Sequence, residues 1–344
     1  MGRWIALIAA LVAAFVLARA SEQTPAPAAV DAPPGEFSAG RAMDDVRIIA
    51  KVPHPVGSPA NAAVRDHVLA RMRALGLETQ VQRADAFNRR AFGDDVYVGG
   101  GIVENVIGVL PGQDRSAPAL AIMAHYDSVP GSPGAADDAA GVASALEIAR
   151  ALKTKGQPAR DVILLITDGE EAGLLGAEAF FGQHPLAKRI GFLINMEARG
   201  NGGRAQMFQT GPDNGGTLEL FRKTAVRPTS SSLAVFLYEN MPNDTDFTVS
   251  RKAGVAGLNY AFIGRQFDYH MPTATPANLD QGSLQDLGGQ TLAAAREAAF
   301  APALPAKAPD LTYSNTAGSH ILAYHPAVGW AVLALSTVLS AIGA

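Results

Sequence analysis

Seven side chains that can bind a metal ion or move a proton lie beside apolar, strand-like segments of this sequence. They are His125, Asp127, Asp137, Glu170, Glu171, Glu197 and His270. Imidazoles and carboxylates are common zinc ligands, and carboxylates also serve as general bases. Because the sequence contains no cysteine, thiolate zinc sites, iron–sulfur clusters and thiol nucleophiles are excluded. Any metal site must therefore use histidine and carboxylate ligands.

Taken singly, most of these residues also have an ordinary structural explanation. Asp137 or Asp138 could cap the helix that follows them, which is a common position for aspartate. Glu170 and Glu171 could be solvated turn residues, and Glu197 could be an exposed charge at a strand end. A single histidine does not define a ligand. The prediction of a site therefore depends on the combination of these residues.

The elements that must position these side chains alternate along the chain. Apolar runs predict strands at residues 78–83, 105–110, 119–124, 161–167, 191–196, 204–210 and 255–261, and helices at 38–52, 61–75, 139–155, 174–181, 215–225, 247–252 and 283–299. This alternation predicts an α/β fold of three layers, with a mixed, mostly parallel central sheet flanked by helices. Sites in such sheets form at the carboxyl ends of the strands, so we expect the seven side chains at one edge.

Gathering these side chains at one edge would place about five negative charges in one cleft, which is costly unless they are protonated or neutralised. Two divalent cations would offset about four of those charges. Two neutral imidazoles among carboxylates suit Zn²⁺ best, so the sequence predicts two zinc ions. A single metal ion is the alternative.

Both ends of the chain carry apolar segments. Residues 1–20 contain one early arginine, an apolar run and an Ala-x-Ala ending, which predicts a signal peptide or, alternatively, an uncleaved anchor. Residues 326–344 are uncharged and predict a transmembrane segment, with a buried helix as the alternative. We expect linkers at 21–36 and 302–325, and one soluble domain at 37–301. That domain would be exported, on the periplasmic or extracellular face, and tethered to the membrane.

The composition excludes two classes of protein. Hydrophobic residues make up 48% of the chain and charged residues 17%, so the chain as a whole is not disordered. Its 28 basic and 32 acidic residues give a net charge of −4, which lacks the basic footprint of a nucleic-acid-binding protein. We therefore expect no nucleic-acid partner.

Six ordered blocks of the sequence resemble the M28 family of zinc exopeptidases. They are HYDS at 125–128, PGAADDAAGVA at 133–143, DGEEAGLLGA at 168–177, NMEARG at 195–200, NDTDF at 243–247 and DYHMPTATPANLD at 268–280. The nearest branch is similar to endoplasmic-reticulum metallopeptidase 1. The resemblance implies an α/β fold, two zinc ions per chain and peptide substrates.

The resemblance also implies roles for individual residues. His125 and Glu197 would hold one zinc ion, Glu171 and His270 would hold the other, and Asp137 would bridge the two. Many relatives have aspartate where Glu197 stands, but glutamate fits the branch resembled here.

The remaining implied roles concern catalysis and substrate. Glu170 would be the general base that activates a metal-bridging water, and Asp127 would orient His125 from behind. Asn243 and Asp244 resemble a substrate-lining block of the family. Apart from the resemblance, Tyr238 and Tyr269 are the candidate donors to the oxyanion. Arg199, two residues after Glu197, could orient that glutamate, contact substrate or form a plain salt bridge.

The resulting hypothesis is a membrane-tethered dizinc aminopeptidase that removes N-terminal residues from peptides. Two alternatives stay open at this point. A single-zinc glutaminyl cyclase would keep the fold and carry out acyl transfer. A peptidase-like binding protein without catalytic activity would keep the fold alone.

Overall fold

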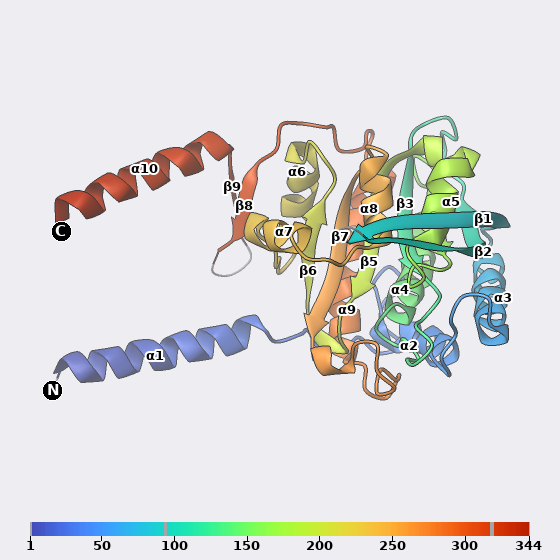
Figure 1. The fold of residues 1–344 in the computed structure, drawn as a ribbon, viewed down its shortest axis with the longest axis horizontal. Helices are drawn as coiled ribbons and strands as arrows, with labels where there is room; N and C mark the ends of the chain where they lie inside the picture. The colour runs from blue at the N-terminus through green and yellow to red at the C-terminus, as the bar shows by residue number, and fades with distance from the viewer. Residues whose placement is uncertain (1, 93–94, 317–319, 344) are drawn as a thin grey trace.

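The computed structural model describes residues 2–92, 95–316 and 320–343. Within these residues the body of the protein is built on a seven-stranded sheet with helices packed around it (Figure 1). Its strands are β1 (Glu78–Phe92), β2 (Asp95–Leu110), β3 (Ala119–His125), β4 (Val162–Thr167), β5 (Ile190–Ala198), β6 (Gly202–Thr210) and β7 (Ala256–Gly264). The helices of the body are α2 (Ala39–Ile49), α3 (Pro59–Ala74), α4 (Ala139–Lys153), α5 (Leu175–Gln183), α6 (Gly215–Thr224), α7 (Ser232–Glu239), α8 (Asp246–Lys252) and α9 (Gln281–Phe300), with 3-10 turns η1 (Pro185–Arg189) and η2 (Gln266–Asp268).

The sheet is mixed, with a parallel centre. Its strand order is β1-β2-β4-β3-β5-β7-β6, and β4, β3, β5 and β7 run parallel. The strands β1 and β2 at one edge and β6 at the other pair antiparallel with their neighbours. The predicted fold class is thus confirmed.

Strand β4 shows why the central strands are largely apolar. Val162, Leu164 and Ile166 enter the larger core, which also contains side chains of α2, α3, α4 and α9. Ile163 and Leu165 point to the opposite face, where they meet α5 and α8 in a second core. Because side chains alternate between the two faces, a strand covered on both sides is apolar over most of its length.

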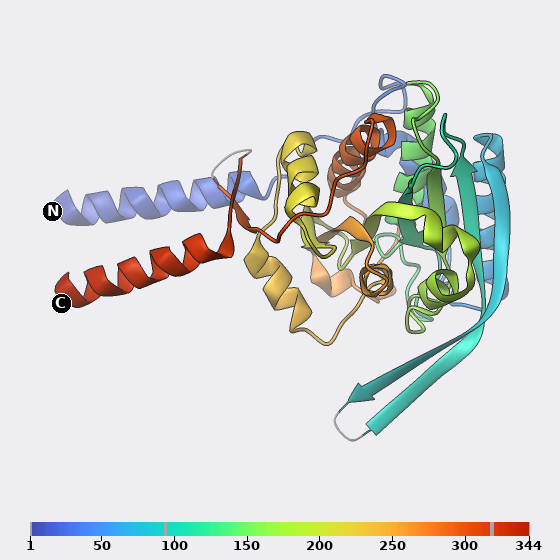
Figure 2. The ribbon, with the colours of Figure 1, turned by 90° about the horizontal axis from the view of Figure 1, so that it is seen from above.

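The structure extends the first two strands far beyond the predicted ranges 78–83 and 105–110. β1 and β2 form one long antiparallel hairpin, in which Phe87 lies opposite Gly100. A Cβ atom on Gly100 would collide with the Phe87 ring, so glycine leaves room for this ring. Figure 2 shows the distal part of the hairpin projecting from the body. The predicted ranges were too short because they followed the apolar pattern. That pattern ends where the hairpin extends beyond the core.

Two further elements were not predicted from the sequence. Helix α7 follows a stretch rich in serine and proline, which reads as a loop. The segment 302–325, predicted as a linker, contains the hairpin of β8 (Thr312–Asn315) and β9 (Ile321–Tyr324). Tyr313 and Ile321 of this hairpin are buried against the larger core.

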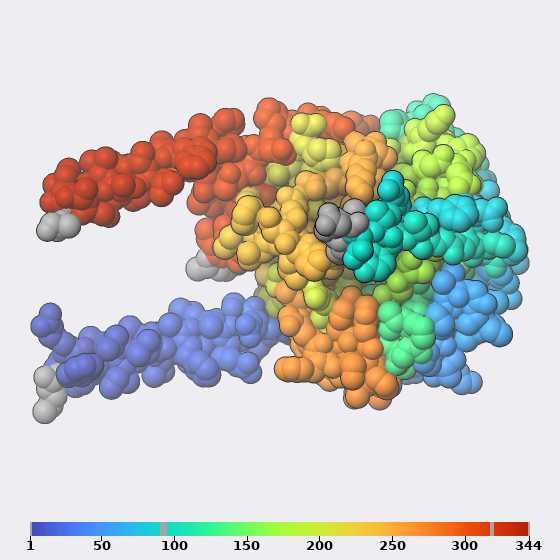
Figure 3. Space-filling model, viewed as in Figure 1, coloured from blue at the N-terminus to red at the C-terminus, as the bar shows by residue number. Residues whose placement is uncertain are grey.

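Two apolar helices, α1 (Gly2–Ser21) and α10 (Pro326–Gly343), extend from the same end of the body and stand clear of it (Figures 1 and 3). By length and composition, α1 could cross a membrane, and α10 is a shorter apolar helix. A signal sequence would meet the same criteria as α1. The assignments of residues 1–20 and 326–344 therefore stay predictions.

The Ala/Pro-rich segment after α1 is held against the body by arginines of three helices, and Arg41 of α2 makes several of these contacts. Arg41 donates hydrogen bonds to the main-chain oxygens of Val30, Ala32 and Glu36, each at 2.8 Å. Its Nε also donates to Oε1 of Glu147 at 2.8 Å, and the Glu147 side chain is only 5% exposed. Arg41 therefore joins this segment to a buried carboxylate of α4.

We expect Arg41→Ala to lower the free energy of unfolding by about 2 kcal/mol, because buried Glu147 loses a charged hydrogen-bond partner. Urea denaturation measures this change, and limited proteolysis should cut residues 30–36 faster. Arg47→Ala is the matched control, since Arg47 lies on the same helix and pairs at the surface with Asp44. Its effect should stay within about 0.5 kcal/mol. Equal stability of the two variants would contradict the role given to Arg41.

Candidate active site

The predicted site residues converge at the carboxyl ends of the parallel strands. His125 is the last residue of β3, and Glu197 lies near the end of the adjacent strand β5. Glu170 and Glu171 lie in the loop that follows β4, the other neighbour of β3. This is the edge at which open α/β sheets place their sites.

Asp137 lies between the two histidines of the set. Its Oδ1 is 3.1 Å from Nε2 of His125, and its Oδ2 is 3.1 Å from Nε2 of His270. His270 follows η2 and has a φ of 57°, a left-handed conformation that is uncommon outside glycine and concentrated at functional sites. One carboxylate thus faces a different imidazole with each of its oxygens.

Each histidine also faces a second carboxylate. Nε2 of His125 is 3.7 Å from Oε2 of Glu197, and Nε2 of His270 is 3.0 Å from Oε1 of Glu171. A tetrahedral zinc ion holds its ligand atoms about 3.3 Å apart, so both groups have the spacing of a ligand set. Among the described residues, no ion pair links these carboxylates to lysine or arginine. The donor set fits metal binding, as the sequence predicts.

Asp138 resolves the choice between capping and ligation that the sequence left open. It is the N-cap of α4: Oδ1 accepts the N–H of Gly141 at 3.0 Å, and Oδ2 accepts the N–H of His125 at 3.2 Å. Although Asp138 lies within ligand distance of His125 and Glu197, both of its oxygens are used by the backbone. Asp138 is therefore the capping residue, and Asp137 is the residue that faces the histidines.

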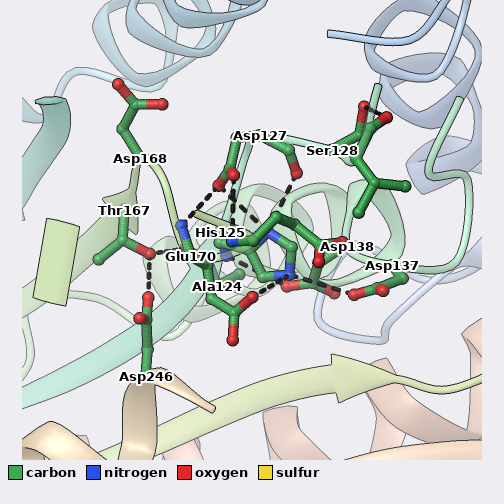
Figure 4. A network of polar contacts seen from close by, with 12 residues as sticks. Ala124, His125, Asp127, Ser128, Asp137, Asp138, Thr167, Asp168, Glu170 and Asp246 are labelled. Carbon is green, nitrogen blue, oxygen red and sulfur yellow. Dashed lines mark hydrogen bonds and ion pairs between the residues drawn. The ribbon is translucent and has the colours of Figure 1, made fainter. Parts of the chain in front are cut away.

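Asp127 holds two parts of the site together (Figure 4). Its Oδ1 accepts the N–H of Glu170 at 3.0 Å, and its Oδ2 accepts the N–H of Glu171 at 3.2 Å. Its Oδ1 also lies 3.4 Å from Nδ1 of His125. The main-chain oxygen of Asp127 lies nearer to that nitrogen, at 3.1 Å, so Asp127 fixes the glutamate loop through its carboxylate and the imidazole ring through both its carbonyl and its carboxylate.

Burial and mutual charge shift the pKa values of the site strongly. Burial raises the pKa of Glu170 well above its usual range and that of Glu171 to about 7. Burial also acts to raise the pKa of Asp137, but hydrogen bonds from His125 and His270 outweigh it and lower that pKa to about 2. Burial acts to lower the pKa of His270, yet Asp137 and Glu171 raise it to about 9. In the metal-free site, protons therefore supply the compensating positive charge.

A buried carboxylate that sequence reasoning missed also lies close to this network. Asp246, the first residue of α8, is 1% exposed and hydrogen-bonds to the hydroxyl of Thr167 at the end of β4 (Figure 4). Burial raises the pKa of Asp246 to about 7. Its only signal in the sequence is its place in the block NDTDF.

A cavity of about 710 Å³ opens beside the acidic cluster. Its wall includes all five residues predicted to contact substrate, together with members of the cluster. The five are Arg199, Tyr238, Asn243, Asp244 and Tyr269. Residues that lie far apart in the sequence therefore line the same cavity.

Three of these five residues are connected to each other or to a histidine of the cluster. The ring of Tyr269 stacks on that of His270, with centroids 3.7 Å apart. The guanidinium carbon of Arg199 lies 5.5 Å from the centroid of Tyr269, and Nη1 of Arg199 donates to Oδ1 of Asn243 at 3.3 Å. Tyr238 stands apart from this group, with its ring edge-on to Phe208 at 4.7 Å.

Part of the cavity wall is apolar and was not predicted. It is formed by side chains of β6, β7, α7 and the loop after α7, namely Phe208, Leu237, Met241, Pro242 and Ile263. None of these residues carries a chemical signal in the sequence. Their role follows only from the packing of α7 beside β6.

Comparison with known proteins assigns the chain to a family. The model of peptidase family M28 matches residues 105–295. Human endoplasmic reticulum metallopeptidase 1 is 30% identical over 318 residues, covering 86% of this chain and 35% of the relative. A vacuolar membrane protease from Candida dubliniensis is 35% identical over 244 residues, covering 70% of this chain and 26% of the relative. The chain thus spans only about a third of the length of these relatives, or less.

Solved structures share the fold at low sequence identity. An aminopeptidase from Aneurinibacillus sp. strain AM-1 has a TM-score of 0.64 at 13% identity, covering 80% of this chain and 97% of its own. A zinc aminopeptidase from Bacillus subtilis has a TM-score of 0.63 at 16% identity, with 80% and 98% covered. A glutaminyl cyclase from Porphyromonas gingivalis has a TM-score of 0.60 at 18% identity, with 76% and 98% covered. The family match confirms the resemblance seen in the sequence, and the chain belongs to peptidase family M28.

Proposed function

We propose that this protein is a dizinc aminopeptidase, which hydrolyses the first peptide bond of its substrates. The observation that carries the proposal is the position of Asp137, whose two oxygens each face a different histidine at 3.1 Å. A carboxylate in that position is suited to bridge two cations. His125 with Glu197 and His270 with Glu171 would complete the two ligand sets.

When bound, zinc would lower the pKa of an attacking water and polarise the scissile carbonyl. The protein supplies the proton transfer. Glu170 is the carboxylate of the loop that is not needed as a ligand, and its Oε2 lies 4.0 Å from Nε2 of His125. It is therefore placed to accept a proton from the water and return it to the leaving amine.

Asp127 supports this chemistry without touching the substrate. Because it accepts the N–H groups of Glu170 and Glu171, it fixes the base relative to the ligand beside it. Its approach to Nδ1 of His125 leaves Nε2 of that ring to face the centre of the site. This is the usual role of a carboxylate behind a metal-binding histidine.

Tyr269 is the better supported donor to the oxyanion. Burial raises the pKa values of both Tyr269 and Tyr238, so both phenols keep their protons at neutral pH. Tyr269 stacks directly on the ring of His270, whereas Tyr238 lies edge-on to Phe208 in the apolar wall. A donor beside a ligand is the one placed to meet charge that develops on the scissile carbonyl.

The cavity favours cleavage at the N-terminus of a peptide. Its acidic end, with Glu170, Glu171 and Asp244, suits a protonated α-amino group. Its apolar wall suits the side chain of the first residue. A single-zinc glutaminyl cyclase shares the fold, but it would not need a carboxylate that faces both histidines.

We also propose that the catalytic domain is exported and held at a membrane. The apolar helix α1 supports this location, because it carries no buried residue and extends away from the body. The names of the matched relatives, which include a vacuolar membrane protease, agree with a membrane-bound setting.

Glu170→Gln should reduce kcat on aminoacyl p-nitroanilides by about 10²–10⁴-fold, because glutamine cannot accept the proton. Elemental analysis should still find two zinc ions per chain, since the five ligands are intact. One zinc ion in the wild-type protein, with ammonia released from N-terminal glutamine, would instead support the cyclase. Turnover near that of the wild type would remove Glu170 from the role of base.

Tyr269→Phe should lower kcat by about 10²-fold, as loss of one oxyanion donor does, with little change in KM. Tyr238→Phe is the matched control, because it removes the same hydroxyl from a tyrosine that packs on Phe208 and not on a histidine of the cluster, and it should change kcat only a few-fold. Steady-state kinetics on leucine p-nitroanilide distinguishes the two. A larger effect at Tyr238 would reverse the assignment.

Zinc should raise the melting temperature more at pH 8 than at pH 6. His270, with a pKa of about 9, and Glu171, with a pKa of about 7, hold protons in the metal-free site. Because zinc must displace those protons, its apparent affinity rises with pH, and the thermal shift rises with affinity. Thermal unfolding at a fixed, chelator-buffered zinc concentration provides the test. An equal shift at both pH values would show that zinc displaces no protons.

A further inference from the structure

A second cavity, of about 1270 Å³, adjoins the catalytic cavity. Gln206, Ile263 and Gln266 line both of them, so the two cavities meet at β6, the end of β7 and the turn η2. Together they form a groove that begins at the acidic cluster. The proposed aminopeptidase reaction uses only the first part of it.

The far end of this groove lies at the C-terminal end of helix α1, which we call the foot of α1. Leu17, Ala18, Ala20 and Ser21, from the last turns of α1, line the second cavity. Helix α10 leaves the body on the same side, and both helices are apolar and stand clear of it (Figures 1 and 3). If α1 lies in a bilayer, the groove opens where the protein meets the membrane surface.

The walls of the second cavity suit an extended peptide. Ile263, Val226 and Pro228 offer apolar contacts, and the amide side chains of Gln206 and Gln266 can donate to and accept from a peptide backbone. Arg204 also lines this cavity. Its guanidinium is paired with a carboxylate, because its Nε donates to Oδ2 of Asp286 at 2.5 Å. Glu22 and Arg227 also line this cavity, so together with Arg204 its wall carries charges of both signs in place of the carboxylate cluster of the catalytic end.

We propose that the groove receives peptides whose downstream part is held in the membrane. The first residue occupies the catalytic cavity, the following residues run past Gln206 and Gln266, and the chain reaches the bilayer at the foot of α1. This inference rests on the proposed aminopeptidase activity and names its substrate class: N-termini that emerge from, or are anchored to, a lipid bilayer.

The absence of cysteine from the natural sequence allows a specific test. Val226, 76% exposed at the mouth of the second cavity, is replaced by cysteine and labelled with a bulky maleimide. Ile48→Cys is the matched control, because Ile48 is 51% exposed on α2 and lines neither cavity. Both full-length proteins are placed in phosphatidylcholine nanodiscs and loaded with zinc.

Three substrates are compared: leucine p-nitroanilide, a soluble hexapeptide with N-terminal leucine, and the same hexapeptide coupled through its C-terminus to a phospholipid. We expect kcat/KM for the anchored peptide to exceed that for the soluble peptide. Labelling at position 226 should lower the ratio of anchored-peptide to p-nitroanilide hydrolysis about tenfold or more, while labelling at position 48 should leave it unchanged. An anchored peptide with a thiol-reactive group near its middle should also cross-link to Val226→Cys and not to Ile48→Cys.

Three results would overturn the inference. They are an unchanged ratio after labelling at position 226, an equal loss for the soluble and anchored peptides, and equal cross-linking at the two cysteines. Failure of the unlabelled protein to hydrolyse leucine p-nitroanilide would instead contradict the proposed aminopeptidase activity, and the inference would fall with it.

Discussion

The crowding of carboxylates at one edge of the sheet is the constraint on which the rest of this site depends. Asp137, Glu170, Glu171 and Glu197 are largely buried around two histidines, and no lysine or arginine of the described residues forms an ion pair with them. Such a group is stable only with added positive charge, from protons or from metal ions. The opposite pKa shifts of Asp137 and Glu171, to about 2 and about 7, show how unevenly two histidines can compensate for several acids.

Two further carboxylates beside this group, those of Asp127 and Asp138, have backbone N–H groups as partners and, in the described part of the chain, no lysine or arginine. Asp127 accepts the two N–H groups of the glutamate loop, and Asp138 accepts those of Gly141 and His125. Two carboxylates are therefore used as scaffolding, which leaves the others free to face the centre of the site. The parallel strands beneath are rigid elements, which hold such a constellation of side chains more precisely than loops would.

Around this centre the protein divides into surfaces with different chemistry. Members of the acidic cluster and an apolar wall from β6, β7 and α7 line one cavity, and a second cavity adjoins it and reaches the end of α1. In the proposed reaction, a bound peptide would place its amino group at the acids and its remaining residues toward the apolar terminal helices. A role at a membrane surface would depend on this orientation of the peptide as well as on the apolar terminal helices.

The sequence alone determined the parallel centre of the sheet, because VILLIT and GFLINM are almost entirely apolar, and it placed the metal-compatible residues at or after the ends of those strands. It also carried the motif order that identifies the family. Tertiary structure decided the rest, because it depends on contacts between distant segments. Only packing brings Asp246 beside Thr167, assigns capping to Asp138 rather than Asp137, and sets α7 against β6 to form the apolar wall. The outer half of the β1–β2 hairpin was not predicted from the sequence. It contacts little of the core, so its residues show no alternation of apolar and polar side chains.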